Sequence, residues 1–120
     1  MIIFMSVRKR IQIKKLKGKS TIDLLFEKGK VIRSKRLLLL SIKKPNKSIY
    51  HSGVSVPKKL FKKAVDRNRI KRQMRVAIAK LDESRLFEGY GMLTYRSNEK
   101  PSVKVLKEEI DTMFVSLKKD

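Results

Sequence analysis

Arginines are concentrated in one short stretch of this 120-residue sequence. Residues 66–75 read DRNRIKRQMR, so four of these ten residues are arginine. A guanidinium is planar, donates paired hydrogen bonds to phosphate oxygens and stacks on bases, whereas a lysine ammonium is a single point charge. Asp66 is the only acidic residue between Lys58 and Lys80. The residue types and their spacing predict a surface that binds a polyanion, and nucleic acid is the leading candidate.

A helix would place this charge on one face. At 100° per residue, Asn68, Arg72 and Arg75 lie opposite the apolar positions Ile70 and Met74. Like charges three or four residues apart destabilise an isolated helix by a few tenths of a kcal/mol per pair. A solvated basic face would carry that repulsion without compensation, so the pattern favours a bound polyanion.

The whole chain has the same bias. Its 32 Lys and Arg against 11 Asp and Glu give a formal net charge of +21, far above the roughly 2–8 that solubility requires. An anionic membrane is the second candidate partner. However, the apolar runs Met1–Met5 and Leu37–Leu40 are much shorter than the ~20 residues of a membrane span. We expect a chain that is cytoplasmic and does not insert into a membrane.

Catalytic constellations are missing from the sequence. There is no cysteine, and His51 is the only histidine. Metal-dependent nucleases gather several carboxylates, but here the acids are scattered, apart from Asp82-Glu83 and the group Glu108, Glu109 and Asp111. We expect the latter group to pair with lysines of its own helix. The sequence therefore predicts no catalytic residue and no metal or cofactor site in the protein itself.

Hydrophobic periodicity predicts the elements that position the arginines. Residues 1–19 are basic and lack a sustained period, so we expect a flexible tail, followed by a single α+β domain over residues 20–120. Two of its strands, separated only by a turn at Pro45 and Asn46, are expected to pair as antiparallel neighbours. The predicted elements are, in order, a helix from an N-cap at Ser20 to Gly29, strands Arg36–Lys43 and Ser48–Val56, a long helix within Lys58–Leu81, strand Tyr90–Arg96, and a helix opened by Pro101-Ser102.

Several of these segments together resemble one family. The string Arg67-Asn68-Arg69-Ile70-Lys71-Arg72, with Arg75 after it, resembles the arginine-rich motif of the bacterial ribonuclease P protein. Agreement extends over about residues 16–118 and includes Ser55–Lys59 (SVPKK), Leu25-Phe26 with Gly29, and Arg96.

The resemblance implies a fold and a function. The fold would be an α-β-β-α-β-α sandwich with a left-handed crossover, similar to ribosomal-protein-like RNA-binding domains. The chain would be an accessory subunit of a hydrolase, the endoribonuclease that matures the 5′ end of tRNA. Its partners would be the catalytic RNA, with one protein per RNA, and the 5′ leader of precursor tRNA. Catalysis and magnesium would belong to the RNA, and the protein itself would hold no cofactor.

The resemblance also implies two sets of contacts. Phe26, Leu40 and Ile22 would line a leader cleft between the sheet and the first helix. Family members often carry aromatics at the positions of Leu40 and Ile22, so base stacking worth roughly 1–3 kcal/mol per base would be lost there. For Phe26, burial in the core is an equal alternative. The implied RNA-binding residues are Arg67, Asn68, Arg69, Lys71, Arg72 and Arg75, with Lys58 and Lys59 near the rim of the cleft.

Three other functions remain open at this point. The first is a ribosome-associated protein that binds structured RNA with the same fold. The second is a non-specific DNA-compacting protein. The third is an endoribonuclease that works without an RNA subunit. Composition alone does not separate these, and only the matched motifs favour ribonuclease P.

Overall fold

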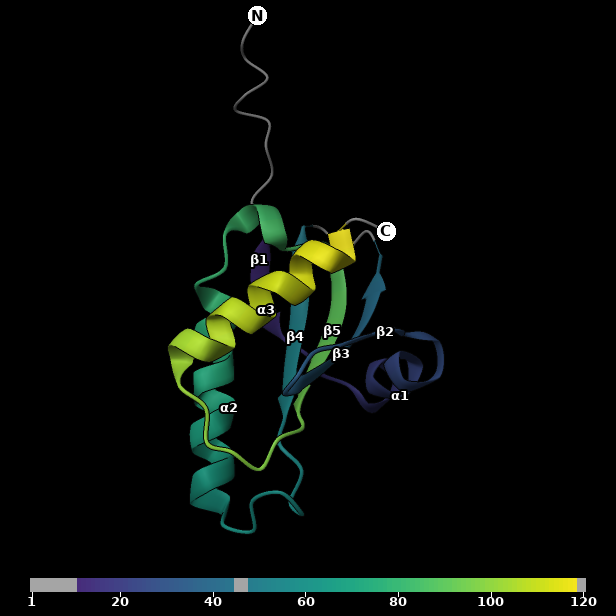
Figure 1. The fold of residues 1–120 in the computed structure, drawn as a ribbon. Helices are drawn as coiled ribbons and strands as arrows, with labels where there is room; N and C mark the ends of the chain where they lie inside the picture. The colour runs from purple at the N-terminus through teal and green to yellow at the C-terminus, as the bar shows by residue number, and fades with distance from the viewer. Residues whose placement is uncertain (1–10, 45–47, 119–120) are drawn as a thin grey trace, which may run out of the picture.

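The computed structural model describes residues 11–44 and 48–118. Within them the chain forms strands along one sheet, three α-helices and a short 3-10 helix (Figure 1). The elements are β1 (Gln12–Lys15), α1 (Lys19–Lys28), β2 (Lys30–Arg33), β3 (Leu37–Lys43), β4 (Ile49–Ser55), α2 (Ala64–Ala79), η2 (Glu83–Arg85), β5 (Gly89–Tyr95) and α3 (Val103–Lys118).

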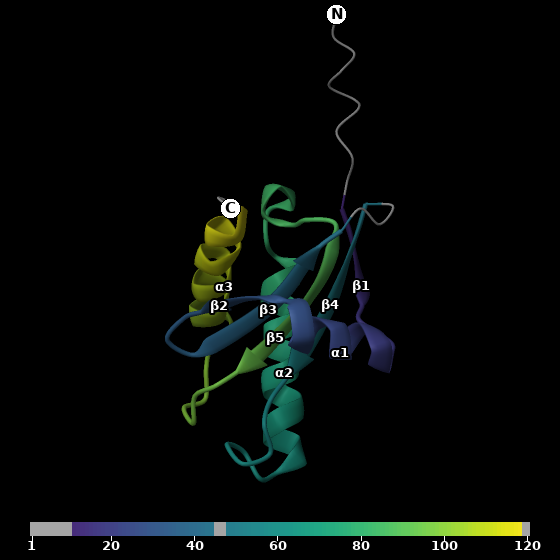
Figure 2. The ribbon, with the colours of Figure 1, turned by 90° about the vertical axis from the view of Figure 1, so that its right-hand side faces the viewer.

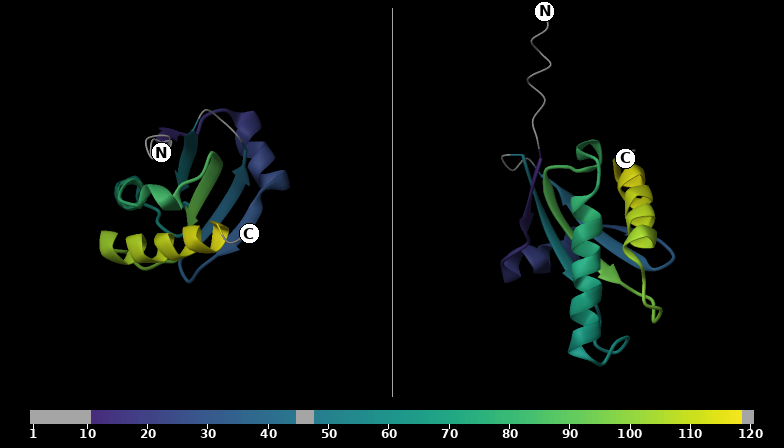
Figure 3. Two further views of the ribbon diagram at one scale, coloured as in Figure 1. Left: turned by 90° about the horizontal axis from the view of Figure 1, so that it is seen from above. Right: turned by 90° about the vertical axis from the view of Figure 1, so that its left-hand side faces the viewer.

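The sheet has five strands in the order β1-β4-β5-β3-β2. Strands β1, β4 and β5 are mutually parallel, and β3 runs antiparallel to both β5 and β2. Helices α2 and α3 lie on one side of the sheet and α1 on the other (Figures 2 and 3). This is the predicted α+β sandwich.

The prediction that β3 and β4 are antiparallel neighbours is wrong, because β5 lies between them. The leucines of β3 explain this. Leu37 and Leu39 are buried in the main core, while Leu40 is buried on the opposite face. A strand buried on both faces belongs inside a sheet, and β3 accordingly pairs with β2 at one edge and β5 at the other.

The crossover between β4 and β5 passes through α2. Seen from the side of α2 and α3, both strands run downward and β5 lies to the right of β4 (Figure 1). A connection above the sheet that moves to the right between downward strands is left-handed, as predicted. Most such connections are right-handed, so this crossover has the uncommon hand.

Strands β1 and β2 were not predicted. All four residues of β1 are exposed, as are three of the four in β2, so neither strand has an apolar alternation to detect. Residues 12–15, which we assigned to the tail, pair with β4 instead. Residues 1–10 lie outside the described part of the chain, and the flexible tail stays a prediction for them.

The main core lies between the sheet and the two helices α2 and α3. The Tyr50 ring packs edge-on against Phe87 and Phe114, with centroid separations of 4.9 and 5.8 Å. Gly91 makes room for this ring, because a Cβ there would overlap the phenol oxygen of Tyr50. The predicted apolar faces of both helices are confirmed by their buried residues, which are Ile70, Met74, Ala77, Ile78, Leu106, Ile110, Met113, Phe114 and Leu117.

A second, smaller core attaches α1 to the opposite face of the sheet. It consists of buried Leu16, Leu25 and Leu40, with partly buried neighbours around them. Helix α1 ends at Gly29 as predicted, but it begins at Lys19 after Gly18, so Ser20 is not its N-cap. Gly18 adopts φ 93°, a left-handed conformation that glycine accommodates without strain.

The carboxylates of α3 pair with arginines of other elements. Glu109 Oε1 lies 3.2 Å from Arg36 Nη1, and Asp111 Oδ1 lies 2.9 Å from Arg85 Nε. The expectation that these acids pair with lysines of their own helix is therefore wrong for Glu109 and Asp111. Both pairs connect α3 to segments that are distant in sequence, so these acids have a structural role.

Candidate nucleic-acid interface

The outer face of α2 is the most arginine-rich surface of the described chain. Asn68, Arg69, Arg72 and Arg75 are exposed, whereas Ile70 and Met74 on the inner face are buried. The sequence placed these residues correctly, because the 100° spacing of a helix fixes which side chains share a face. Lys71 is half-buried at the margin between the two faces.

Arg67 points back toward the chain that precedes α2. Its Nη1 donates hydrogen bonds to the backbone carbonyls of Phe61, at 2.9 Å, and Lys62, at 2.8 Å. These bonds hold the turn between β4 and α2, and that turn presents the exposed Lys58 and Lys59. Arg67 thus braces the helix start, and its contact with RNA stays a prediction.

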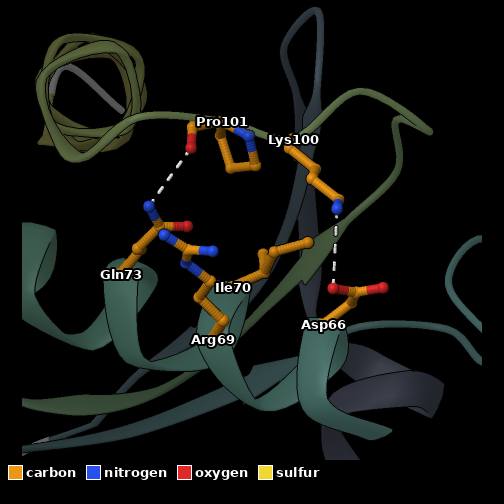
Figure 4. Close-up of a pocket in the computed structure, with 6 residues that line it drawn as sticks. All are labelled: Asp66, Arg69, Ile70, Gln73, Lys100 and Pro101. Carbon is orange, nitrogen blue, oxygen red and sulfur yellow. Dashed lines mark hydrogen bonds and ion pairs between the residues drawn. The ribbon is translucent and has the colours of Figure 1, made fainter. Parts of the chain in front are cut away.

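A small cavity of about 160 Å³ lies between α2 and the loop after β5 (Figure 4). Two contacts span it: Lys100 Nζ lies 3.6 Å from Asp66 Oδ1, and Gln73 Nε2 donates to the Pro101 carbonyl at 3.2 Å. Arg69 lies beside this cavity (Figure 4). Lys100 therefore adds a positive charge next to the arginine face. This neighbour was not predicted, because the two segments are far apart along the chain.

On its other flank, α2 faces β1 across a groove of about 320 Å³. Arg75 and Ile78 line it from the helix, and Lys14 and Lys15 from the strand. Both lysines fall within the basic tail that was predicted for residues 1–19. Because β1 pairs with β4, the structure places them next to the arginine face.

The residues predicted for the leader cleft lie in different environments. Leu40 is buried and Ile22 packs against it in the small core. Phe26 has 66% of its surface exposed, so the alternative that it belongs to the core is wrong. Phe61 is buried in the main core near Tyr95. An accessible aromatic is thus present at only one of the three predicted cleft positions.

No side-chain cluster suited to a catalytic metal is found within residues 11–44 and 48–118. His51 stacks on Tyr90, with ring centroids 5.1 Å apart. Among the same residues, no helix is long and apolar enough to cross a membrane.

Burial lowers the acidity of two tyrosines in the main core. It raises the pKa of Tyr50, and it raises the pKa of Tyr95 against the opposing effect of a hydrogen bond with Ser97. The Tyr95 hydroxyl donates to the Glu99 carbonyl at 2.6 Å. Both rings are buried in the main core.

The strand order, the left-handed crossover and the arginine-lined helix define a small basic protein of the ribonuclease P protein fold. Solved structures share this fold. The RNase P protein of Staphylococcus aureus gives a TM-score of 0.72 at 22% identity and covers 87% of this chain and 94% of its own. The RNase P protein from Thermotoga maritima also gives a TM-score of 0.72, at 20% identity, and the match covers 84% of this chain and 94% of that protein.

Sequence comparison supplies the family itself. The profile of the family described as Ribonuclease P matches residues 12–118, so this chain belongs to that family. The ribonuclease P protein component of Brevibacillus brevis is 34% identical over 68 residues, 57% of this chain and 53% of that protein. The component of Microcystis aeruginosa is 37% identical over 75 residues, and the match covers 58% of this chain and 61% of that protein. The matched segments thus span somewhat more than half the length of these curated relatives.

Proposed function

We propose that this chain is the protein subunit of ribonuclease P. It binds the catalytic RNA and the 5′ leader of precursor tRNA, and so assists 5′ maturation of tRNA in the cytoplasm, with one protein per RNA. The observation that carries this proposal is the exposed face of Asn68, Arg69, Arg72 and Arg75 in a chain whose residues 12–118 match the family.

The physical role of the protein follows from charge. Two RNAs that approach each other repel through their phosphates, and counterions normally screen this repulsion. Guanidinium groups on a rigid helix also screen this repulsion, and they do so at fixed positions, because each can hold two phosphate oxygens. The protein therefore lowers the magnesium concentration that the complex requires. In this proposal the RNA supplies the catalytic chemistry, and no residue of the protein takes part in bond breaking.

The leader would bind beside α1. Phe26 offers an exposed ring for stacking, and the exposed Lys58 and Lys59 offer charges for phosphates. Leu40 and Ile22 would form the apolar base of this cleft, because both pack in the small core beneath α1. Binding the leader would give precursor tRNA a higher affinity than mature tRNA.

The decisive experiment is cleavage of a precursor tRNA that carries a 5′ leader, at low magnesium, by a bacterial ribonuclease P RNA with and without this protein. We expect strong rescue by the protein and no cleavage by the protein alone. Tight RNA binding without rescue would overturn the proposal in favour of a ribosome-associated role. Cleavage without any RNA subunit would overturn the assignment of catalysis to the RNA.

The arginine face is tested by the double substitution Arg72→Ala with Arg75→Ala. We expect a higher Kd for the catalytic RNA with an unchanged thermal unfolding midpoint, because both side chains are exposed and make no described contact with the core. Lys104→Ala with Lys107→Ala is the matched control, because this double substitution removes two positive charges from exposed positions on α3. An equal Kd for the two double variants would contradict the assignment of this face.

A further inference from the structure

The cavity between α2 and the loop after β5 differs in chemistry from the arginine face beside it (Figure 4). Asp66, Arg69 and Gln73 line it from one side of α2, because residues three, four and seven positions apart share a helix face. Lys100 and Pro101 form the opposite wall. The Asp66 carboxylate repels phosphate, so a ligand that enters this cavity differs from the phosphates that suit the arginine face.

Two polar contacts close the cavity at its two ends. Lys100 Nζ lies 3.6 Å from Asp66 Oδ1 at one end, and Gln73 Nε2 donates to the Pro101 carbonyl at the other (Figure 4). Asp66 and Gln73 are seven residues apart, which corresponds to a rise of about 10.5 Å along α2. A hydrogen bond of about 2.9 Å at each end leaves about 5 Å between them. This space suits one six-membered ring with its substituents.

The volume of the cavity and its apolar parts agree with a planar ring. The volume is about 160 Å³, and a protein cavity of about 150 Å³ accommodates benzene. Ile70, which is buried, supplies an apolar floor. Arg69 is exposed beside the cavity, and its planar guanidinium can stack on the face of a ring.

The hydrogen-bonding groups indicate which ring fits. The distance of 3.6 Å between Lys100 and Asp66 is longer than the about 2.7–2.9 Å of a charge-assisted hydrogen bond, so the carboxylate can still accept from a ligand. The Gln73 amide has a second N–H besides the one that bonds Pro101. The cavity therefore offers an acceptor at one end and donors at the other. Cytosine presents an amino group that carboxylates accept from, whereas a carbonyl oxygen occupies that position in uracil.

We propose that this cavity binds one unpaired cytosine base of an RNA whose phosphates lie on the arginine face. Asp66 accepts a hydrogen bond from the amino group of the base, Gln73 donates to its carbonyl oxygen, and Arg69 stacks on the ring. The protein thus reads the identity of one base, which phosphate contacts alone do not do. The source of the RNA rests on the proposed function: the cytosine belongs either to the catalytic RNA or to precursor tRNA.

Titration with cytidine 5′-monophosphate and with uridine 5′-monophosphate tests the cavity directly. The two nucleotides carry the same charge, so attraction to the basic surface is equal for both. The side-chain amide resonances of Gln73 report on the cavity, and Gln12 is the only other glutamine. We expect these resonances to shift with a Kd about fivefold lower for the cytidine nucleotide, the lower end of discrimination by side-chain contacts to a base. Equal Kd values, unmoved Gln73 resonances or tighter binding of guanosine 5′-monophosphate would overturn the proposal.

Asp66→Asn tests the acceptor. An amide of the same shape can turn either its oxygen or its NH₂ toward the ligand, so we expect the preference for cytidine over uridine to disappear. Asp82→Asn, an exposed acid just beyond α2, is the matched control and should keep the preference. The ratio of two Kd values within one folded variant does not depend on a change in its stability. A preference that persists in Asp66→Asn would mean that Asp66 only holds Lys100.

The same variants identify the RNA, and here the sign of the effect is informative. Removal of a negative charge beside the arginine face should by itself tighten binding of a polyanion. We expect Asp66→Asn instead to raise the Kd about fivefold, because the contact with the base is lost, whereas Asp82→Asn should not raise it.

A rise for the catalytic RNA assigns the cytosine to that RNA, and a rise confined to precursor tRNA, measured with the catalytic RNA present, assigns it to the substrate. An unchanged or lower Kd in both assays would overturn a role for the cavity in the complex. The proposed function fails separately, through a lack of rescue in the cleavage assay, and the nucleotide titration does not depend on it.

Discussion

At the scale of single residues, Glu109 makes the densest set of polar contacts on α3. Its carboxylate accepts hydrogen bonds from the Ser34 hydroxyl, from the Arg36 backbone N–H at 2.8 Å and from the Arg36 guanidinium at 3.2 Å. Burial disfavours the charged form, but these bonds outweigh it and lower the pKa of the carboxyl. The residue therefore fastens α3 to the turn between β2 and β3 in its ionised state.

This depressed pKa has a consequence for acid stability. Stability from Glu109 is present above the ordinary carboxyl pKa of 4.5 and is lost as pH falls through the lower folded value. We expect Glu109→Ala to reduce the free energy of unfolding by about 1–3 kcal/mol at pH 7, because the Arg36 donors lose their acceptor. The difference from the wild type should shrink toward pH 3.

Urea unfolding at the two pH values measures this difference. Glu108→Ala is the matched control, because Glu108 is the exposed neighbour on the same helix. The free energy of unfolding of Glu109→Ala should depend less on pH than that of Glu108→Ala. An equally steep fall in both variants would show that the stabilising hydrogen bonds of Glu109 do not depend on its charge.

At the scale of elements, the start of α2 depends on Arg67. This side chain bonds two carbonyls of the preceding turn, whereas Arg72 on the outer face has no described partner in the chain. We expect Arg67→Ala to lower the free energy of unfolding by about 1–3 kcal/mol. Arg72→Ala, which removes the same charge, should change it by less than about 0.5 kcal/mol.

Thermal or urea unfolding of the two variants, followed by circular dichroism, makes this comparison. Equal stabilities would mean that the bonds of Arg67 do not hold the turn. A catalytic-RNA affinity that falls more in Arg72→Ala than in Arg67→Ala would agree with the division between an RNA-contacting and a bracing arginine.

The elements also show what the sequence could predict. Helices α2 and α3 have unbroken apolar stripes, and β3 is a run of leucines, so these three elements and the arginine face of α2 were predicted correctly. Strands β1 and β2 are exposed edge strands without such a pattern. The His51–Tyr90 pair depends on the register between β4 and β5, two strands that the chain visits almost forty residues apart. Local periodicity contains no information about that pairing.

At the scale of the whole molecule, the charges that give the net +21 are unevenly distributed. Exposed arginines lie along the outer face of α2, and Lys14 and Lys15 of β1 line a groove together with Arg75. The acids Glu109 and Asp111 are instead engaged with Arg36 and Arg85. Because a small domain with this charge repels itself, a bound polyanion should stabilise the fold as well as form a complex.

The same distribution predicts a steep salt dependence for binding of the catalytic RNA. Each phosphate that the protein neutralises releases counterions and contributes about −0.7 to −0.9 to the slope of log K against log salt concentration. If Arg72 and Arg75 each neutralise one phosphate, their double alanine variant should have a slope shallower by about 1.4–1.8. Lys104→Ala with Lys107→Ala removes two exposed charges of α3 instead and should keep the wild-type slope. Filter binding between about 50 and 200 mM salt measures all three proteins. Equal slopes for the wild type and the α2 variant would show that Arg72 and Arg75 do not neutralise phosphates, so that this face would act through its shape and not through its charge.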